Sequence, residues 1–374
     1  MNTDDPSGYG LSSDKKSHTI EPPRIHYLPQ IPKDLSVPIA LIGTGGISEY
    51  HLQAYQELGL NVVALCDRNL DAAISRRDQY YPDAAVYTDY RELFDKHEIK
   101  VADITTHPSV RTEIIEAALI RGIHVLSQKP FVTDLADGHH LRALAKKHHA
   151  MLAVNQNGRW APHFSYMRNA IASGLIGDVV SVDFSLQWDQ TWIAGIPAFE
   201  SMHHMVLFDF AIHWFDILGT FMQGNDPTMV YAVARKSPIQ TYQPPALASV
   251  SIAYPHAVAS MSLNAHTQLG EEDTTTIVGT QGTLRSRGPG LNDQPEMELY
   301  LPEGQTQVSL QGSWFTHGFQ GTMCELLCAI EENREPSNHA ESSMKALELC
   351  FAAVKSAESG QAVSPGDVTR LSQF

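Results

Sequence analysis

A lysine and a histidine in separate parts of the chain carry the side chains needed to move protons at a substrate hydroxyl. Lys129 follows an apolar run that ends at Ser127 and precedes Pro130, and a proline restricts the residue before it to extended backbone conformations. His213 lies four residues after Asp209, which places both side chains on one face of a helix. A carboxylate beside an imidazole raises its proton affinity, as suits a base that takes a proton from an alcohol.

Each of these residues also has a structural interpretation. Lys129 would otherwise be a solvated surface lysine, Asp209 the N-cap of a helix over 210–222, and His213 a satisfied interior histidine among aromatic neighbours. Asp216 lies next along the same helix face, where it could orient His213 or form part of a substrate pocket. A metal site built from these two aspartates and the histidine is the less favoured alternative, and no metal is predicted.

A glycine-rich turn near the start of the chain has the form of a dinucleotide-binding loop. The run from Ile39 to Ser48 is typical of a short strand, a turn containing Gly43, Gly45 and Gly46, and the start of a helix. The first glycine permits the tight turn, the second lets backbone N–H groups approach the phosphates, and the helix dipole attracts a pyrophosphate. Ser48 replaces the third glycine of G-x-G-x-x-G, and a purely structural glycine turn is the alternative.

An acidic residue downstream of this turn favours NAD over NADP as the cofactor. Asp67 follows a second apolar run at about the distance where a carboxylate accepts the ribose hydroxyls of a dinucleotide. Its negative charge would repel the additional phosphate of NADP. The neighbouring Arg68 could pair with that phosphate instead, so NADP is kept as the less favoured cofactor.

The elements that would position these residues change character near the middle of the chain. As far as residue 154, apolar strands alternate with amphipathic helices, an arrangement that produces a parallel sheet with helices on both faces. Strands are predicted at 38–42, 61–66, 101–105, 123–127 and 151–154, and helices at 48–58, 70–80, 110–121 and 134–149. Beyond Gly158 the predicted strands are 179–188, 229–235, 248–254, 257–265, 274–278 and 296–301, with helices at 162–173, 316–333 and 341–359.

This pattern predicts an α/β domain followed by an α+β domain. We expect a Rossmann dinucleotide-binding domain over 37–155, and a domain for substrate binding and oligomerisation, built on an open, mainly antiparallel sheet, over 156–374. Residues 1–36 are rich in polar residues and proline and are expected to form a flexible arm. The open sheet has a face that needs covering, which predicts a homodimer or homotetramer.

Composition narrows the classes of partner and compartment. The chain has 374 residues, 43% of them hydrophobic, and a formal net charge of -16. That charge argues against nucleic acid or an anionic membrane as a partner. Because no stretch resembles a signal peptide or is apolar for long enough to span a bilayer, a cytoplasmic protein is expected. Its four cysteines are too few for a disulfide framework and are expected to be reduced core residues.

Three further local sequences now bring a resemblance into view: Gln128-Lys129-Pro130, the run from Asn155 to Trp160, and Asp209-x-x-x-His213. Together with the glycine turn, they resemble the glucose-fructose oxidoreductase, inositol dehydrogenase and MocA-type family of nicotinamide-dependent oxidoreductases, from Val37 to the C-terminus. In that family the glycine turn, an E-K-P tripeptide and a D-x-x-x-H pair carry function. The resemblance therefore implies that Lys129, Asp209 and His213 are catalytic.

The chain departs from the family pattern at several positions. Gln128 stands where the family usually has glutamate, Ala211 where D-x-G-x-H has glycine, and the run from Thr106 to Arg111 replaces T-P-P-x-x-H. The motifs and the resemblance together assign cofactor contacts to Gly43, Gly45, Gly46, Ile47, Asp67, Arg68, Thr106, His107, Pro108, Gln128, Lys129 and Pro130. They assign substrate contacts to Lys129, Asn157, Arg159, Trp160, Asp209 and His213, with Arg159 as a donor fork and Trp160 as an aromatic wall of the cleft.

These residues predict hydride transfer between a nicotinamide ring and a hydroxyl of a sugar, glycoside or cyclitol. His213 would accept the hydroxyl proton, Lys129 would steady the oxygen, and Asp209 would hold the histidine or a neighbouring hydroxyl. Two alternatives stay open at this point. One is an NAD-dependent glycosidase that oxidises a sugar transiently and then returns the hydride; the other is a nicotinamide-sensing regulator without turnover.

Overall fold

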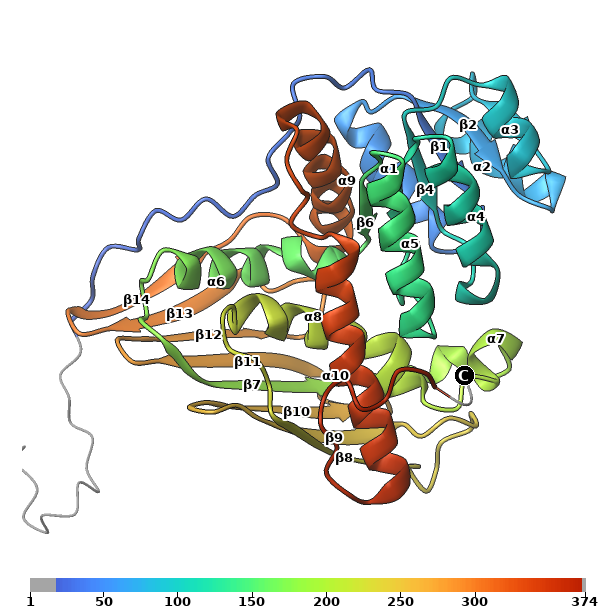
Figure 1. The fold of residues 1–374 in the computed structure, drawn as a ribbon. Helices are drawn as coiled ribbons and strands as arrows, with labels where there is room; N and C mark the ends of the chain where they lie inside the picture. The colour runs from blue at the N-terminus through green and yellow to red at the C-terminus, as the bar shows by residue number, and fades with distance from the viewer. Residues whose placement is uncertain (1–17, 372–374) are drawn as a thin grey trace, which may run out of the picture.

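Two β-sheets organise the chain, which the computed structural model describes over residues 18–371 (Figure 1). The first sheet has six parallel strands in the order β3-β2-β1-β4-β5-β6. These strands are β1 Ile39–Ile42, β2 Val62–Cys66, β3 Ala85–Tyr87, β4 Val101–Ile104, β5 His124–Ser127 and β6 Leu152–Val154. The helices between them are α1 Ser48–Leu58, α2 Leu70–Tyr80, α3 Tyr90–Lys96, α4 Pro108–Ile120 and α5 Leu135–Lys147.

This first sheet confirms the predicted Rossmann arrangement. Its strands β1, β4 and β5 are buried along their whole length, as expected for a parallel sheet covered on both faces. The strand order reverses between β1 and β4, and ligands of such sheets bind at the carboxyl end of the strands where the order reverses. Strand β3 and helix α3 were not predicted, because three half-buried residues and two turns of helix show too little periodicity.

The second sheet has eight strands in the order β14-β13-β12-β11-β7-β10-β9-β8, with β7 and β10 parallel and the other neighbours antiparallel. The strands are β7 Val179–Gln187, β8 Met229–Arg235, β9 Leu247–Ala253, β10 Val258–Asn264, β11 Glu272–Gly279, β12 Thr283–Gly288, β13 Glu296–Leu301 and β14 Gly304–Ser309. The helical segments are η1 Asn157–Trp160, α6 Pro162–Ala172, η2 Thr191–Ile193, α7 Pro197–Glu200, η3 Val206–Phe210, α8 Ile212–Phe221, α9 Trp314–Glu332 and α10 Ala340–Ser359. The open, mainly antiparallel sheet is therefore confirmed, while β12 and β14 were missed.

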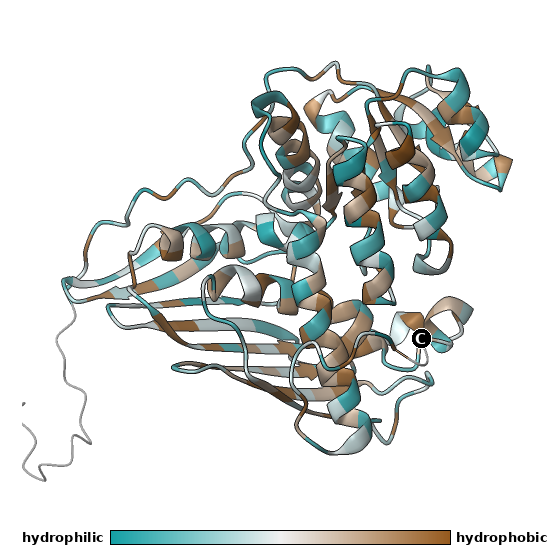
Figure 2. Ribbon diagram, viewed as in Figure 1, coloured by the Kyte–Doolittle hydropathy of each residue, from teal (hydrophilic) through white to brown (hydrophobic). Residues whose placement is uncertain are grey.

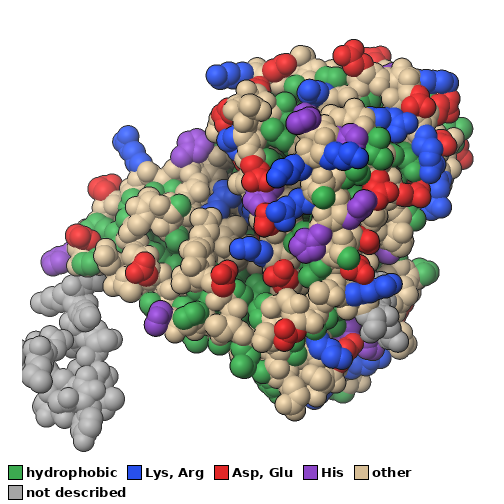
Figure 3. All heavy atoms as spheres, viewed as in Figure 1, with side chains coloured by type: hydrophobic (Ala, Val, Ile, Leu, Met, Phe, Trp, Pro, Cys, Tyr) green, Lys and Arg blue, Asp and Glu red, His purple; other side chains and the backbone are tan. Residues whose placement is uncertain are grey.

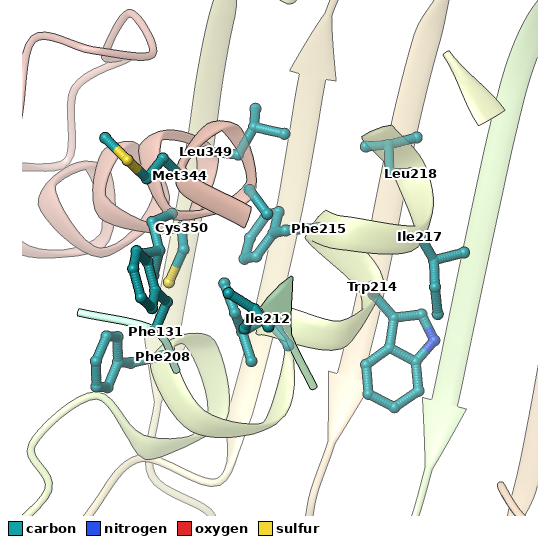
Figure 4. Close-up of a cluster of buried hydrophobic side chains, with 14 of the residues drawn as sticks. Phe131, Phe208, Ile212, Trp214, Phe215, Ile217, Leu218, Met344, Leu349 and Cys350 are labelled. Atoms are coloured by element: carbon teal, nitrogen blue, oxygen red, sulfur yellow. The ribbon is translucent and has the colours of Figure 1, made fainter. Parts of the chain in front are cut away.

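Helices α6, α8 and α10 lie over one face of this second sheet (Figure 1). Buried and exposed residues alternate along β9 and β10, so each strand turns its apolar side chains toward the helices. Hydrophobic and hydrophilic colours accordingly alternate along strands of this sheet (Figure 2). In Figure 4, Ile212 and Phe215 of α8 face Cys350 of α10, whereas Trp214 and Ile217 lie on another side of the helix. Helix α8 is thus packed on more than one side, which holds the residues at its start.

Helix α9 belongs to the second half of the chain but packs on the first sheet. Phe319, Met323 and Leu326 share a buried cluster with Leu41 of β1 and Tyr55 of α1. The expected boundary at residue 155 falls between β6 and η1, and this packing crosses it. The two halves are therefore joined by a hydrophobic contact as well as by the chain itself.

Residues 18–36, part of the arm predicted from composition, lie along the surface and make hydrogen bonds with it. Thr19 forms a bridge with Gln305 of β14, the Ser165 hydroxyl donates to Tyr27 O over 2.6 Å, and the Asp34 N–H donates to Glu331 Oε1 over 2.7 Å. Figure 1 shows the segment running past β14 and α9 before it enters the first sheet. The polar groups of this segment therefore find partners on the rest of the protein. Residues 1–17 lie outside the described residues.

Surface and core composition can be reported for the described part of the chain. Side chains of both charges are interspersed over the face seen in Figure 3. None of the helices described between residues 18 and 371 is long and apolar enough to cross a membrane. The four cysteines, Cys66, Cys324, Cys328 and Cys350, are buried and free.

Candidate active site

The lysine and aspartate singled out in the sequence form an ion pair that joins the two halves of the chain. Lys129 follows β5, and its Nζ lies 2.9 Å from the backbone oxygen of Asp209 and 3.1 Å from Oδ1. Asp209 belongs to η3, a π-helical turn directly before α8. The two side chains are 15% and 16% exposed, so solvent and salt screen their attraction less than at the open surface. The pair fixes the Lys129 ammonium at the carboxyl edge of the first sheet.

His213 lies in the first turn of α8, close enough to Lys129 for the ammonium charge to lower the pKa of the imidazole. Burial and, to a smaller extent, the Lys129 ammonium hold the pKa of His213 well below its usual range. Its ring centre is 5.5 Å from that of Trp314, edge to face, and its buried Nδ1 has no hydrogen-bond partner among residues 18–371. The imidazole is therefore neutral and able to accept a proton.

The expected influence of Asp209 on His213 is not found. The prediction was that the Asp209 carboxylate would raise the proton affinity of the imidazole, but the pKa of His213 is lowered instead. The physical reason is that Asp209 accepts its hydrogen bonds from Lys129, while burial of the His213 ring disfavours the charged form. Nor does Asp209 cap a helix as the alternative proposed, because it lies inside η3.

The glycine turn leaves open space where a pyrophosphate would lie. Gly43 has φ +101°, and a Cβ there would come within 3.0 Å of Thr106, so glycine is required. At Gly45 and Gly46 a Cβ would meet no atom within 4 Å. Helix α1 begins at Ser48, where a dinucleotide would meet its N-terminal N–H groups. The turn thus offers both the access and the positive dipole end that a phosphate needs.

Asp67 braces this turn from the neighbouring strand. Its Oδ2 accepts from the Thr44 N–H over 2.7 Å, and its Oδ1 accepts from the Asn69 N–H over 2.8 Å. The carboxylate therefore lies at the end of β2, beside the loop, where ribose hydroxyls are bound in such sheets. Ile47 is half-buried in the turn and Arg68 is exposed next to Asp67.

Two more loops at the same edge, residues 106–108 after β4 and residues 128–130 after β5, complete the space for a cofactor. Thr106, His107 and Pro108 follow β4, and the His107 side chain accepts from the Ser109 N–H as the N-cap of α4. The buried hydroxyl of Thr106 has no partner within the described chain, nor does that of Thr44. Partnerless hydroxyls beside an open glycine turn fit a dinucleotide, whose phosphates and ribose hydroxyls would supply the missing hydrogen bonds.

A buried arginine, Arg111, holds these two loops together, although no role was predicted for it. The Arg111 Nε donates to Thr106 O over 3.0 Å, and its Nη1 donates to the backbone oxygens of Gln128 and Pro130. One guanidinium thus ties the loop after β4 to both sides of Lys129. The only available signal was that arginine stands where the family pattern has histidine.

The structure gives Arg159 and Asp216 a different role from the one expected. The Arg159 Nε is 2.6 Å from Asp216 Oδ2, and its Nη2 is 2.5 Å from Oδ1. Its Nη1 donates to Ser337 O over 2.6 Å. Because this buried pair uses the donor fork, Arg159 is not free to bind a sugar, and Asp216 does not orient His213. Their geometry instead pins η1 and α8 to the segment before α10.

Trp160 and Asn157 are likewise part of the packing. A Cβ at Gly321 would lie 2.1 Å from Trp160 Cγ, so the indole lies directly against α9. Asn157 Oδ1 accepts from Trp314 Nε1 over 3.1 Å. Asn157 therefore supports Trp314, which in turn flanks His213, and the pattern around residues 155–160 had not shown this link.

A group of tryptophans surrounds the start of α8. The ring of Trp214 lies 5.6 Å from that of Trp314 and 5.1 Å from that of Trp188. The indole nitrogens of Trp188 and Trp214 are buried without a partner in the described residues. Trp188, Trp214 and Trp314 are all buried, so their rings form a packed wall behind the start of α8. The sequence had no pattern that marked Trp214 or Trp314.

No group of three or more histidine, cysteine, aspartate or glutamate side chains that could hold a metal ion occurs within residues 18–371. The three-residue metal alternative built from Asp209, His213 and Asp216 is contradicted by their partners, because Asp209 binds Lys129 and Asp216 binds Arg159.

Comparison with known proteins places both halves of the chain. Residues 37–156 match the NAD-binding Rossmann-fold domain of an oxidoreductase family, and residues 164–285 match the C-terminal domain of GFO/IDH/MocA proteins. D-apiose dehydrogenase of Paraburkholderia graminis is 25% identical over 343 residues, covering 87% of this chain and 88% of that protein. Inositol 2-dehydrogenase of Salmonella typhimurium is 25% identical over 217 residues, covering 57% of this chain and 63% of that protein.

Solved structures share the fold over most of the chain. An oxidoreductase from Agrobacterium radiobacter, in complex with NAD+, L-tartaric acid and magnesium, has a TM-score of 0.80 at 23% identity, covering 88% of this chain and 99% of its own. A levoglucosan dehydrogenase in complex with NADH and levoglucosan has a TM-score of 0.76 at 18% identity, covering 89% and 100%. At these identities the likeness establishes the architecture.

Proposed function

Because the chain belongs to the Gfo/Idh/MocA oxidoreductase family, with its NAD-binding Rossmann domain, we propose that it transfers a hydride between NAD and a hydroxyl of a sugar, glycoside or cyclitol. The observation that carries this proposal is the contact of Lys129 with Asp209, near a neutral His213, at the carboxyl edge of the Rossmann sheet. The similarity to a D-apiose dehydrogenase and an inositol dehydrogenase supports the substrate class.

The cofactor would be held by the three loops at this edge. The open turn of Gly43, Gly45 and Gly46 would take the pyrophosphate, and Asp67 the adenosine ribose. The loop of Thr106, His107 and Pro108 and that of residues 128–130 would line the nicotinamide end. Bound NAD would supply the hydride acceptor for the carbinol carbon. Asp67 supports NAD over NADP, because the additional ribose phosphate of NADP would meet its carboxylate.

The chain's own residues would handle the proton. His213, neutral because burial lowers its pKa, would take the proton from the substrate hydroxyl. Lys129 would donate a hydrogen bond to the same oxygen and stabilise its developing negative charge. Asp209, bound to the ammonium group, would hold Lys129 in place. The tryptophans around the start of α8 would exclude water from the reacting atoms.

Titration with NAD and NADP, followed by a panel of sugars, cyclitols and glycosides, tests this proposal. The panel includes D-apiose and myo-inositol and is monitored for NADH and for hydrolysis products. Formation of NADH with a preference for NAD is expected. Hydrolysis without net NADH would support the redox-assisted glycosidase, whereas NAD binding without turnover across the panel would support a regulator.

We propose in addition that a second copy of the chain covers the outer face of the eight-stranded sheet. The helices lie on one face only (Figure 1), and the other carries small polar side chains such as Ser249 and Ser251 on β9 and Ser262 on β10, all exposed. Small side chains let two flat sheet faces approach closely. A homodimer or homotetramer would then form around this face.

The free cysteines support a reducing compartment, and we propose the cytoplasm.

A further inference from the structure

A buried chain of polar side chains runs from the backbone of Lys129 to the carboxylate of Asp103. The Lys129 N–H donates to Gln128 Oε1 over 2.7 Å, and Gln128 Nε2 lies 3.2 Å from His51 Nε2. The other ring nitrogen of His51, Nδ1, lies 2.7 Å from Asp103 Oδ2. His51 and Asp103 are both 0% exposed, so water does not compete for these contacts.

The positions of the protons follow from the first bond of this chain. A backbone N–H can only donate, so the Gln128 atom that Lys129 meets must be the amide oxygen. The amide nitrogen of Gln128 is then a donor, and His51 Nε2 must accept from it without carrying a proton. His51 is therefore a neutral imidazole with its proton on Nδ1, and this N–H donates a hydrogen bond to Asp103 Oδ2.

A second amide leads to the same order. Asn155 Nδ2 lies 3.3 Å from Gln128 Oε1 and 3.1 Å from His51 Nε2. Because the Gln128 oxygen needs donors, the Asn155 atom facing it must be nitrogen, which also makes that nitrogen a donor toward His51. The hydroxyl of Thr322 on α9 donates to Asn155 Oδ1 over 2.8 Å. Helix α9 thus reaches the Lys129 loop through side chains as well as through its apolar face.

We propose that His51 is a positioning residue for Lys129, a neutral imidazole whose direction of hydrogen bonding is set by Asp103. Asp103 Oδ2 also accepts from the Tyr55 hydroxyl over 2.7 Å, so the carboxylate lies between two donors of α1. Because His51 Nε2 accepts from the Gln128 amide nitrogen, the Gln128 amide oxygen faces the Lys129 N–H and holds it. The direction in which the Lys129 side chain leaves the loop is thereby fixed from behind. Only the importance of Lys129 for turnover rests on the proposed function.

The same direction of hydrogen bonding explains why an amide suits position 128, where the family pattern has glutamate. A carboxylate there would turn an oxygen toward His51 Nε2, and the imidazole would need a second proton between two buried carboxylates. With Asp103→Asn, by contrast, a Gln128→Glu carboxylate could accept from a proton on Nε2, and the whole order would run in the opposite direction. Asp103 and Gln128 are therefore coupled through His51.

A first test observes the His51 tautomer and needs no substrate. Protein labelled with nitrogen-15 at histidine is examined by NMR, and the His51 signals are assigned by their loss in His51→Gln. The proton is expected on Nδ1 in the unsubstituted protein and on Nε2 in the Asp103→Asn/Gln128→Glu double variant. A proton on Nε2, or on both nitrogens, of the unsubstituted protein would overturn the proposal.

A second test is a double-mutant cycle that follows hydrogen exchange of the Lys129 amide together with turnover. Gln128→Glu alone should speed this exchange, and lower kcat, by up to about tenfold, the scale of one lost hydrogen bond. Adding Asp103→Asn should restore most of both losses. As a matched control, Asp273→Asn removes a buried acid from the other sheet and should restore neither.

The outcomes separate this inference from the proposed function. Equal effects of Gln128→Glu with and without Asp103→Asn would reject the coupling, even if the protein forms NADH with a substrate of the panel. If it forms no NADH with any of them, the proposed function fails, while the tautomer and the amide exchange still decide whether His51 positions Lys129.

Discussion

At the scale of single residues, the candidate site separates a charged group from a neutral one. Lys129 is paired with Asp209, whereas burial and the nearby ammonium hold the pKa of His213 well below its usual range. An imidazole kept neutral and an ammonium kept in contact with a carboxylate can act on the same hydroxyl, one as proton acceptor and the other as donor of a hydrogen bond.

Removing either group should slow the chemical step. Lys129→Met and His213→Ala should each lower kcat by about a hundredfold or more, the scale of a lost acid-base group, because the proton transfer or the stabilised oxygen is lost. The cofactor should still bind, as measured by the change in fluorescence of added NADH. The control His203→Ala replaces an exposed histidine and should leave kcat unchanged. Full activity in both site variants would remove the proposed roles.

A second prediction at this scale concerns stability rather than turnover. Asp273 on β11 is fully buried, and burial raises its pKa from 3.8 to about 8. The folded protein therefore keeps this proton at neutral pH, while the unfolded chain releases it above about pH 4. The contribution of Asp273 to stability is complete at low pH and is lost as the pH rises toward 8.

Asp273→Asn should remove this dependence. Relative to the unsubstituted protein, the variant should gain free energy of unfolding between pH 5 and pH 8, by about 1.4 kcal/mol for each pH unit at most. Urea unfolding at the two pH values measures the gain. The exposed Asp83→Asn serves as the control, with the same small effect at both. An Asp273→Asn effect that does not change with pH would contradict the assignment.

At the scale of elements, helix α9 is the piece that joins the halves. Its apolar residues cover the first sheet, its Thr322 reaches Asn155, and its Gly321 lets Trp160 lie against the backbone. The loops after β4 and β5 are joined in a similar way by Arg111. The candidate site thus depends on how elements are fastened as much as on the residues within it.

Two glycine substitutions should change stability in opposite directions. Gly321→Ala places a Cβ 2.1 Å from Trp160 Cγ and should destabilise the protein by about 1–3 kcal/mol through overpacking. Gly219→Ala, in an exposed position of α8 with no atom within 4 Å, should stabilise it by up to about 1 kcal/mol through helix propensity. Thermal unfolding of the two variants measures both effects. A Gly321→Ala variant that is as stable as the unsubstituted protein would argue against the tight α9 contact.

At the scale of the whole molecule, the outer face of the second sheet is where self-association should be visible. The central position Ser251 on β9 pairs with Ser260 and Tyr231 of the neighbouring strands. Ser251→Arg would bury a charge between two sheet faces, so it should lower the mass in solution toward the 41.3 kDa of one chain. Light scattering gives the mass. Ser359→Arg, at the exposed end of α10, should leave it unchanged; an unsubstituted protein that is already monomeric would reject the proposal.

Much of the fold could be predicted because its signals are local. The helices at 48–58 and 70–80 and the strands at 229–235 and 296–301 were predicted with the bounds that the structure has. Each shows a hydrophobic period over enough residues to be recognised. Strand β12, with Arg285 and Arg287 on its exposed side, and the three-residue β3 were missed, because charge and short length hide the period.

The sequence by itself determined the Rossmann half and marked the glycine turn with Asp67, and it singled out Lys129, Asp209 and His213 as the candidates for acting on a hydroxyl. Only the tertiary structure decided the partners: Asp209 binds Lys129 rather than His213, and Arg159 binds Asp216 rather than a ligand. The physical reason is that period and motif depend on residues close in the chain, whereas a buried charge takes whichever opposite charge the packing of distant elements brings to it.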